Sequence, residues 1–251
     1  MRSNLIINNF KFKIKPNRKK KLLKYLNNIN SLEWPNFIKS FKKNYNYSYN
    51  KEIINKYKKF SNINIIGMGG SSLGTKAIYS FLKHKIKKKL LFSDNLNLHK
   101  QNIPKGLNII ISKSGNTLET VVNSNEALAK KNKNIFITEK NNNYLKKLAK
   151  KLKSDVIEHK NFIGGRFSVL SEVGMLPSEL MGLNERKFKQ FNNLIIKKNF
   201  LNNLIQNTLC TYTFIKKRKF NSIILNYDTN SEDLFKWYQQ LVSESLGKNS
   251  K

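Results

Sequence analysis

Two short polar segments of this chain have the composition of loops that bind phosphate groups. The first, Gly67–Gly74, has the sequence GMGGSSLG and follows a short β-branched run. The second, Ser112–Thr117, has the sequence SKSGNT and follows the apolar run Leu107–Ile111. Glycine lets the backbone approach a ligand closely, while hydroxyls and the free N–H groups of a following helix bind phosphate oxygens. Together the two segments predict a site for a phosphorylated small molecule.

Each segment also has a simpler interpretation. The first lacks both the GxGxxG and the GxxxxGK[ST] spacing. The nearest acidic residue that could bind a ribose, Asp94, ends a later strand-like run. A tight turn therefore explains it about as well. In the second, Thr117 could simply cap the helix that follows. A cap accounts for one hydroxyl and leaves Ser112 and Ser114 unexplained.

The elements around these segments predict an α/β fold with a parallel sheet. Short apolar runs alternate with helix-like stretches, which is typical of βαβ units whose sheet is covered on both faces. Ligands of such sheets collect at the carboxyl ends of the strands, where both polar segments lie. We expect strands at residues 63–66, 107–111 and 134–138, and helices at residues 75–83, 117–131 and 142–152.

The rest of the chain predicts two further regions. Residues 1–60 form a helical preface, and residues 61–180 form the first α/β domain. In residues 181–251 a helical connection, which begins near residue 178 and extends to about 217, leads to a new strand at 222–227 and a helix at 231–246. One strand and one helix cannot bury their own apolar faces. We therefore expect them either to pack on the first domain or to be the start of an incomplete second unit.

The composition limits the choice of partners and compartment. The chain carries 48 basic and 15 acidic residues, a net charge of +33, which by itself suggests a nucleic-acid partner. The lysines are spread along the whole chain together with many Asn and Ile, as AT-rich codons produce, so we expect neither nucleic acid nor membrane as partner. Cys210 is the only cysteine, and no signal sequence or long apolar run occurs, which predicts the cytoplasm. No clustered metal ligands or redox motif occur, so no cofactor is expected.

Four segments carry a resemblance to a known family. Residues 112–120 resemble the Ser-x-Ser-Gly-x-Thr-x-Glu phosphate loop of sugar isomerase (SIS) domains. Residues 66–74 are similar to the Gly-Gly-Ser-x-Leu-Gly loop of glucose-6-phosphate isomerases, and residues 164–171 to their Gly-Gly-Arg-[Tyr/Phe]-Ser-x-x-Ser segment. Residues 238–248 resemble the family's Gln-Gln-x-x-x-Glu-Ser-x-Gly-Lys segment. The matches occur in the family's order and span residues 62–248.

The resemblance implies a fold, a reaction and a set of residues. The fold is an SIS-type three-layer αβα sandwich plus the start of a second one. The reaction interconverts glucose 6-phosphate and fructose 6-phosphate through an enediolate, a step of glycolysis and gluconeogenesis. Glu244 matches the catalytic base, and Arg166 suits the stabilisation of the enediolate oxygen. Without the resemblance, Glu244 would be interpreted as a surface charge, whereas Arg166 stands out because Lys dominates elsewhere and two glycines precede it. The phosphate is expected at Gly70, Ser71, Ser112, Lys113, Ser114 and Thr117.

The resemblance also exposes a gap. The family carries a ring-opening histidine and a catalytic lysine downstream of the glutamate, and its dimers share that histidine between subunits. This chain ends seven residues after Glu244. His84, His99 and His159 lie outside the matched segments and are expected on the surface. If nothing follows Lys251, we expect sugar-phosphate binding with little turnover. The alternatives are a non-catalytic SIS module that senses a sugar phosphate and, less favoured, a nucleic-acid-binding protein.

Overall fold

The computed structural model describes residues 20, 24, 36–96, 104–128, 132–190, 193, 197–217 and 223–247. Contacts between residues divide the chain into two units. The larger unit comprises Asn36–Lys189 and Asn226–Lys251, and it contains every residue of the predicted site. The smaller comprises Met1–Pro35 and Gln190–Leu225, in which α8 (Lys198–Lys216) buries Ile205 and Leu209 and leaves Cys210 half-buried.

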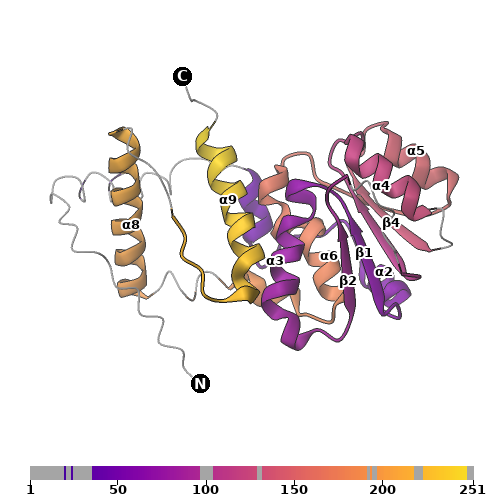
Figure 1. The fold of residues 1–251 in the computed structure, drawn as a ribbon, viewed down its shortest axis with the longest axis horizontal. Helices are drawn as coiled ribbons and strands as arrows, with labels where there is room; N and C mark the ends of the chain where they lie inside the picture. Colours follow the sequence, from indigo (N-terminus) through magenta and orange to yellow (C-terminus); the bar gives the residue numbers. More distant parts are fainter. Residues whose placement is uncertain are drawn as a thin grey trace. The chain divides into compact units, whose positions relative to one another are not determined.

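The larger unit is built on a parallel sheet (Figure 1). Its strand order is β2-β1-β3-β4-β5, so the direction of winding reverses between β1 and β3. In such sheets the crevice at the reversal, outside the carboxyl ends of the two strands, is where ligands bind. The three predicted strands are confirmed as β1, β3 and β4. The strands are β1 (Asn62–Ile66), β2 (Lys89–Ser93), β3 (Leu107–Ile111), β4 (Lys133–Thr138) and β5 (Asp155–Glu158).

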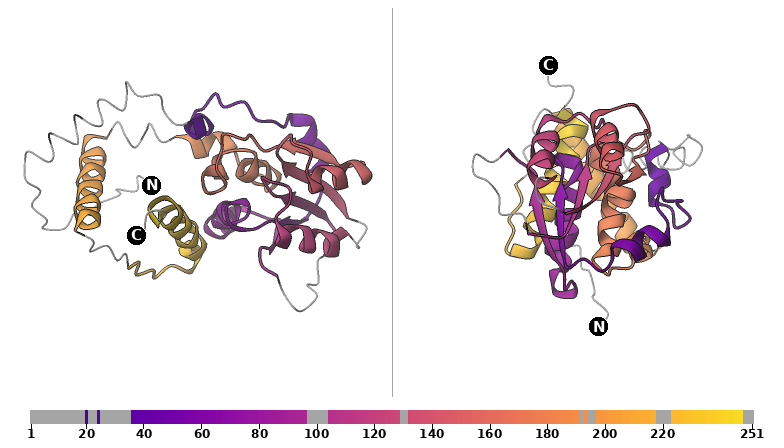
Figure 2. Two further views of the ribbon diagram at one scale, coloured as in Figure 1. Left: turned by 90° about the horizontal axis from the view of Figure 1, so that it is seen from above. Right: turned by 90° about the vertical axis from the view of Figure 1, so that its right-hand side faces the viewer.

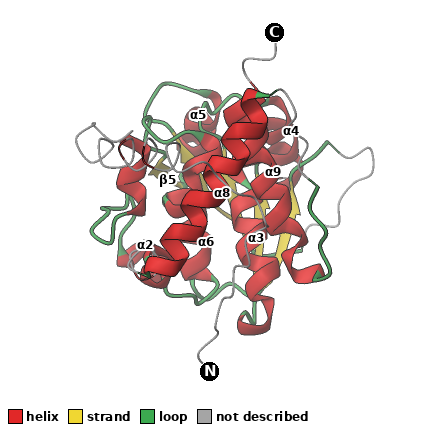
Figure 3. Cartoon of the chain, turned by 90° about the vertical axis from the view of Figure 1, so that its left-hand side faces the viewer, coloured by secondary structure: helices red, strands yellow, loops and turns green. Residues whose placement is uncertain are grey.

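Helices cover both faces of this sheet (Figures 2 and 3). Successive side chains of a strand point to opposite faces. Ile63 and Ile65 accordingly pack with α2 and α6, whereas Ile66 packs with α4 and α5. The predicted three-layer αβα sandwich is therefore confirmed. The helices of this unit are α2 (Lys51–Tyr57), α3 (Leu73–Leu82), α4 (Leu118–Leu128), α5 (Tyr144–Lys151), α6 (Glu172–Leu180) and α9 (Glu232–Leu246).

A row of three amides, two of them fully buried and the third half-buried, crosses the central strands of the sheet. Asn64, Asn108 and Asn134 occupy matching positions on β1, β3 and β4. The Nδ2 of Asn64 donates to the Oδ1 of Asn108 over 2.8 Å, and Asn108 in turn donates to Asn134 over 2.9 Å. A shift of one strand by one residue would bury these amides without partners, at a cost of about 1–3 kcal/mol each. The row thus fixes the register that aligns the carboxyl ends of the strands.

Two expectations about the second half of the chain were wrong. The helical region begins at Glu172, not near residue 178, because α6 contains Gly174 and Pro177, which obscure its pattern. The expected strand at 222–227 is absent: its described residues, 223–227, form no strand. Leu225 and Tyr227 are 75% and 94% exposed, and no described strand pairs with them. A strand without a neighbour cannot pair its backbone groups.

The last predicted helix, at residues 231–246, is confirmed as α9. It packs on the first domain, which is one of the two arrangements that the sequence left open. α9 packs along α3, and Figure 1 shows the two helices side by side. The hydroxyl of Ser80 in α3 donates to the carboxylate of Asp233 in α9. The indole of Trp237 in α9 donates to the backbone oxygen of Arg166 over 3.4 Å. Packing on the first domain therefore brings the carboxyl half of α9 to the edge of the sheet where the polar loops lie.

Only part of the predicted helical preface can be compared with the structure, since residues 1–35, apart from 20 and 24, lie outside the described residues. The described part contains η1 (Asn36–Phe41) and α2. It is tied to α6 by Glu172, whose fully buried carboxylate accepts from the hydroxyl of Tyr45 and the backbone N–H of Ser48. In the part of the chain that the structure describes, no helix combines the length and apolarity that a membrane crossing requires.

Candidate functional site

A cleft of about 580 Å³ lies at the carboxyl edge of the sheet, at the reversal between β1 and β3. It is formed by the loops after β1 and β3, by the Gly-Gly-Arg segment and by α9. Seven of the eight predicted site residues line it, and Ser112 does not. The lining residues are Met68, Gly69, Gly70, Ser71, Lys113, Ser114, Thr117, Glu139, Gly165, Arg166, Gln240 and Glu244.

The loop after β1 packs its backbone directly on the Gly-Gly-Arg segment. A Cβ placed on Gly70 would lie 2.3 Å from the carbonyl carbon of Gly165. The hydroxyl of Ser168 donates to the backbone oxygens of Gly70 and Gly165, over 3.1 and 2.7 Å. The backbone of Gly69 has a φ of +56°, which L side chains rarely adopt. The loop therefore requires glycine at position 70, where two backbones approach closely, and at position 69, where φ is positive.

The loop after β3 is held in shape by its own hydroxyls. The Oγ of Ser112, which is buried, lies 2.8 Å from the Oγ1 of Thr117 and accepts from the backbone N–H of Gly115 over 3.1 Å. Gly115 has a φ of +70°. A Cβ placed on it would lie 2.1 Å from the Oδ1 of Asn143, the N-cap of α5. Ser112 thus shapes the loop from beneath. Ser114 and Thr117 line the cleft in front of the first turn of α4.

The predicted base and the predicted oxyanion-stabilising group meet in this cleft. The Nη1 of Arg166 lies 3.3 Å from the Oε2 of Glu244, residues that are far apart in the sequence. The Nε2 of Gln240 donates to the other carboxylate oxygen over 2.8 Å. The guanidinium also stacks on Phe167, with Cζ 4.7 Å from the ring centroid. Arg166 and Gln240 therefore fix the orientation of the Glu244 carboxylate.

Two polar residues of the cleft were missed by the sequence analysis. Glu139 follows β4, and its Oε1 lies 3.6 Å from the Nζ of Lys113. It could have been found as the first charged residue after the third predicted strand. Gln240 lies one helical turn before Glu244, a spacing that places two side chains on one face of a helix. Its Oε1 is buried and has no hydrogen-bond partner in the described part of the chain.

Comparisons with known proteins decide the family. The family model for phosphoglucose isomerase matches residues 34–251. The chain belongs to the phosphoglucose isomerase family. It is 34% identical to the glucose-6-phosphate isomerase of Methanocaldococcus jannaschii over 79% of this chain and 54% of that protein. It is 31% identical to the enzyme of Mycoplasma mycoides over 88% of this chain and 57% of that protein. The chain thus spans about half the length of the curated relatives it matches.

A solved structure supports the fold. The crystal structure of a hypothetical protein from Thermus thermophilus superposes with a TM-score of 0.69 and 20% sequence identity. The match covers 92% of this chain and 61% of the other. The α/β architecture predicted for an SIS-type domain is therefore shared with a known structure over nearly the whole chain.

The histidines of this chain do not all lie where expected. His84 is exposed, as predicted, and His99 lies outside the described residues. For His159 the expectation was wrong, because its side chain is only 2% exposed. Burial lowers the pKa of the imidazole, and the charge of Lys113 acts in the same direction. The surrounding lysines suggested a surface position, but His159 directly follows β5, at the end of the sheet core.

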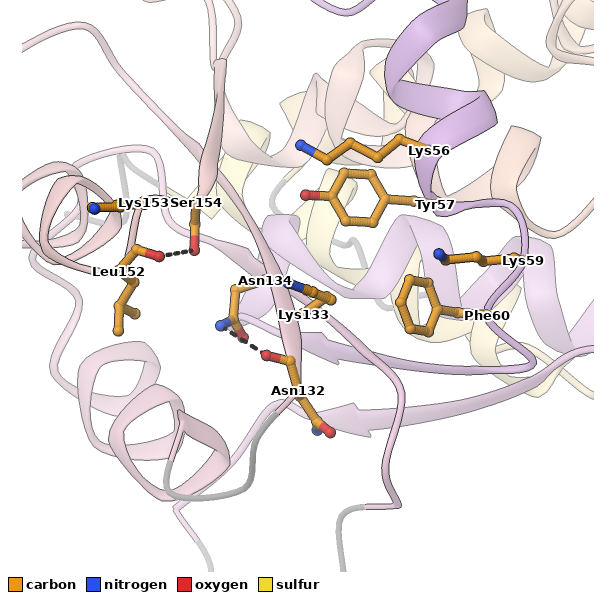
Figure 4. Close-up of a pocket in the computed structure, with 10 residues that line it drawn as sticks. All are labelled: Lys56, Tyr57, Lys59, Phe60, Asn132, Lys133, Asn134, Leu152, Lys153 and Ser154. Carbon is orange, nitrogen blue, oxygen red and sulfur yellow. Dashed lines mark hydrogen bonds between the residues drawn. The ribbon is translucent and has the colours of Figure 1, made fainter.

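A second pocket lies at the opposite, amino edge of the sheet and contains none of the predicted residues (Figure 4). It measures about 240 Å³ and lies between α2, the start of β4 and the turn before β5. One cation of this pocket, Lys56, is neutralised by Asp155, 2.7 Å away. The hydroxyl of Tyr57 donates to the same carboxylate. The predicted chemistry therefore belongs to the cleft at the carboxyl edge.

Proposed function

We propose that this chain provides the phosphate-binding and proton-transferring part of a glucose-6-phosphate isomerase. The observation that carries the proposal is the Arg166–Glu244 pair, 3.3 Å apart, in the same cleft as both phosphate-type loops. Family membership adds support. A cleft that only sensed a phosphate would need the loops but not a carboxylate held by a guanidinium.

In this proposal the substrate phosphate lies at the reversal of the sheet. The hydroxyls of Ser114 and Thr117 and the free N–H groups at the start of α4 bind its oxygens, and Lys113 adds charge. Gly70 and Ser71 approach from the loop after β1. Ser112 acts indirectly, since its hydroxyl holds Thr117 in place. Binding of the remote phosphate orients the reacting carbons, which offer little binding energy of their own.

The isomerisation step then needs one base and one positive group. Glu244 removes the proton from C2 of the open-chain aldose and returns it to C1. The hydroxyl proton moves from O2 to O1 at the same time, so that the carbonyl moves from C1 to C2. Arg166 donates to the oxygen that becomes negative in the enediolate. Because the guanidinium already contacts the carboxylate, both groups are oriented toward the same region before substrate arrives. The reverse reaction uses the same groups in the opposite order.

The proposal extends to assembly and location. A homodimer is proposed from the family resemblance, and a cytoplasmic location from the single cysteine, which permits no intrachain disulfide. Nucleic acid is not part of the proposal, because the charged lining of the cleft contains as many carboxylates as cations.

The test combines binding with hydrogen exchange. Binding of fructose 6-phosphate is measured by calorimetry, and NMR in D₂O follows exchange of the hydrogens at C1 of fructose 6-phosphate, which requires the base and the enediolate. We expect binding by the wild-type chain, together with exchange that Glu244→Gln removes while binding stays within about threefold. Binding without exchange would favour the non-catalytic module. Absence of binding would overturn the proposal.

A further inference from the structure

The charge balance of the cleft differs from that of the chain. The chain carries 48 basic and 15 acidic residues. The charged residues lining the cleft are Lys113, Arg166, Glu139 and Glu244, so its two positive and two negative charges sum to zero. Each cation faces a carboxylate, since Arg166 pairs with Glu244 over 3.3 Å and Lys113 with Glu139 over 3.6 Å. The proposed reaction accounts for Glu244. It does not account for an acidic residue beside a phosphate loop.

Glu139 is fixed beside that loop by its backbone and its side chain. Its N–H donates to the backbone oxygen of Lys113 over 3.1 Å, which joins the end of β4 to the loop after β3. One carboxylate oxygen faces the Lys113 ammonium, and the other accepts from the Nδ2 of Asn141 over 3.2 Å. The side chain is 17% exposed. The negative charge is therefore held at the cleft wall and only partly screened by water.

Lys113 already has partners without a ligand. Its ammonium donates to the backbone oxygen of Asn161 over 2.7 Å and faces the carboxylate of Glu139. A phosphate bound at Ser114 and Thr117 must compete with Glu139 for this positive charge. Repulsion between the carboxylate and the ligand grows with each negative charge that the ligand carries.

We propose that Glu139 is a specificity-determining residue, which competes with bound phosphate for the Lys113 ammonium and so favours a single phosphomonoester over more highly charged anions. This inference rests on the part of the proposed function that places a phosphate at the loops. Its new element is that neutral donors, the hydroxyls and N–H groups, hold most of that phosphate. With Lys113 largely neutralised, a pyrophosphate-like group gains little attraction and meets more repulsion.

The first experiment compares two inorganic probes on the full chain. Phosphate and pyrophosphate are titrated at constant ionic strength into wild type and Glu139→Gln, since salt screens these charges. Glutamine keeps an acceptor for Asn141. We expect Glu139→Gln to bind phosphate about fivefold more tightly and pyrophosphate at least about tenfold more tightly. Unchanged affinities, or equal gains for both anions, would overturn the proposal.

Glu158→Gln is the matched control. Glu158 ends the neighbouring strand β5, and its carboxylate lies 3.0 Å from the ammonium of Lys140, but it does not line the cleft. Removing this paired carboxylate raises the net positive charge of the chain by the same amount. We expect affinities within about twofold of wild type. A gain as large as that of Glu139→Gln would mean that overall charge, rather than Glu139, sets anion affinity.

A second background tests the competition for Lys113. In Lys113→Met, we expect the gain from Glu139→Gln to fall to about half or less, because no ammonium remains to be released and only the direct repulsion between carboxylate and ligand is relieved. A gain of full size would show that Glu139 acts without Lys113. Glu139→Asp, which withdraws the carboxylate but keeps its charge, should give a smaller gain in the same direction.

If wild type binds neither phosphate nor fructose 6-phosphate, the proposed function fails. If it binds both and Glu139→Gln changes neither affinity, only this inference fails.

Discussion

Gly70 and Gly165 meet backbone to backbone, and their contact joins two motifs that are far apart in the sequence. A Cβ on Gly70 would lie 2.3 Å from the carbonyl carbon of Gly165 and 2.7 Å from the backbone nitrogen of Arg166. The loop after β1 therefore acts as the support on which the arginine is positioned. Gly70 must lack a side chain for this contact, whereas a Cβ on Gly165 would lie an ordinary 4.0 Å from the Cα of Gly70.

Gly70→Ala should therefore displace the Gly-Gly-Arg segment. We expect a loss of about 1–3 kcal/mol in the free energy of unfolding, because backbone atoms cannot yield as a flexible side chain can. Fructose 6-phosphate binding should weaken in parallel. Gly164→Ala is the control, since its Cβ would meet only Phe167 at an ordinary 3.5 Å. Urea unfolding and calorimetry measure both effects; equal behaviour of the two variants would contradict this account.

A second pair of glycines separates steric crowding from backbone strain. Gly115 and Gly182 both have positive φ, +70° and +89°, so alanine is strained at either position. At Gly115 the new Cβ would also lie 2.1 Å from the Oδ1 of Asn143, which caps α5. At Gly182 no atom of the described residues lies within 4 Å of the new Cβ. We expect Gly115→Ala to cost about 1–2 kcal/mol more than Gly182→Ala in urea unfolding, through loss of the cap. Identical costs would show that Asn143 moves freely.

Arg166→Lys tests whether the planar guanidinium matters or only its charge. Lysine cannot both stack on Phe167 and donate to Glu244 in the same geometry. We expect hydrogen exchange in fructose 6-phosphate to fall about 10²–10³-fold, with a loss of binding below about tenfold. Arg186→Lys is the control, because Arg186 is 83% exposed. Exchange unchanged in Arg166→Lys would remove Arg166 from the proposed mechanism.

The sequence revealed the parts of the site that local patterns define and missed those that depend on packing. The loops at residues 67–74 and 112–117 follow strands that are largely apolar, so both loops and strands could be predicted. The burial of His159 could not, because its surroundings in sequence are lysine-rich while its neighbours in space belong to β4 and β5. The expected strand at 222–227 was wrong because its sequence suggests a strand but its described surroundings in space do not provide one to pair with. Its pattern is β-like, but strand formation requires a neighbour in space.

Lys189 is also buried by contacts that its sequence does not reveal. We expect this burial to make the free energy of unfolding of the larger unit depend on pH. Its side chain is 4% exposed, and its ammonium has no hydrogen-bond partner among the residues that the structure describes. It lies 4.5 Å from the ring centroid of Tyr45 and 4.3 Å from that of Tyr47. Burial lowers the pKa of Lys189 to about 8, against the opposing charges of Glu185 and Glu172.

The sign of the effect follows from proton binding. Above pH 8 the folded chain loses the Lys189 proton while the unfolded chain, with an ordinary lysine pKa, keeps it. The unfolded state then binds more protons, so the free energy of unfolding rises with pH. We expect a contribution of about 1 kcal/mol between about pH 8 and 9.5. Above that window the raised pKa values of Tyr45 and Tyr47 act in the opposite direction, because the folded state then keeps protons that the unfolded state loses.

Lys189→Met should remove this rise and should stabilise the chain at neutral pH, where wild type buries a charge. Methionine is of similar length and packs well against aromatic rings. Lys187→Met is the control, since Lys187 is exposed and lies two residues earlier in the same 3₁₀ segment. Urea unfolding at about pH 7, 8 and 9.5 gives the three free energies for each variant. If Lys189→Met shows the same rise as wild type, the pH dependence arises elsewhere and the buried ammonium is not its source.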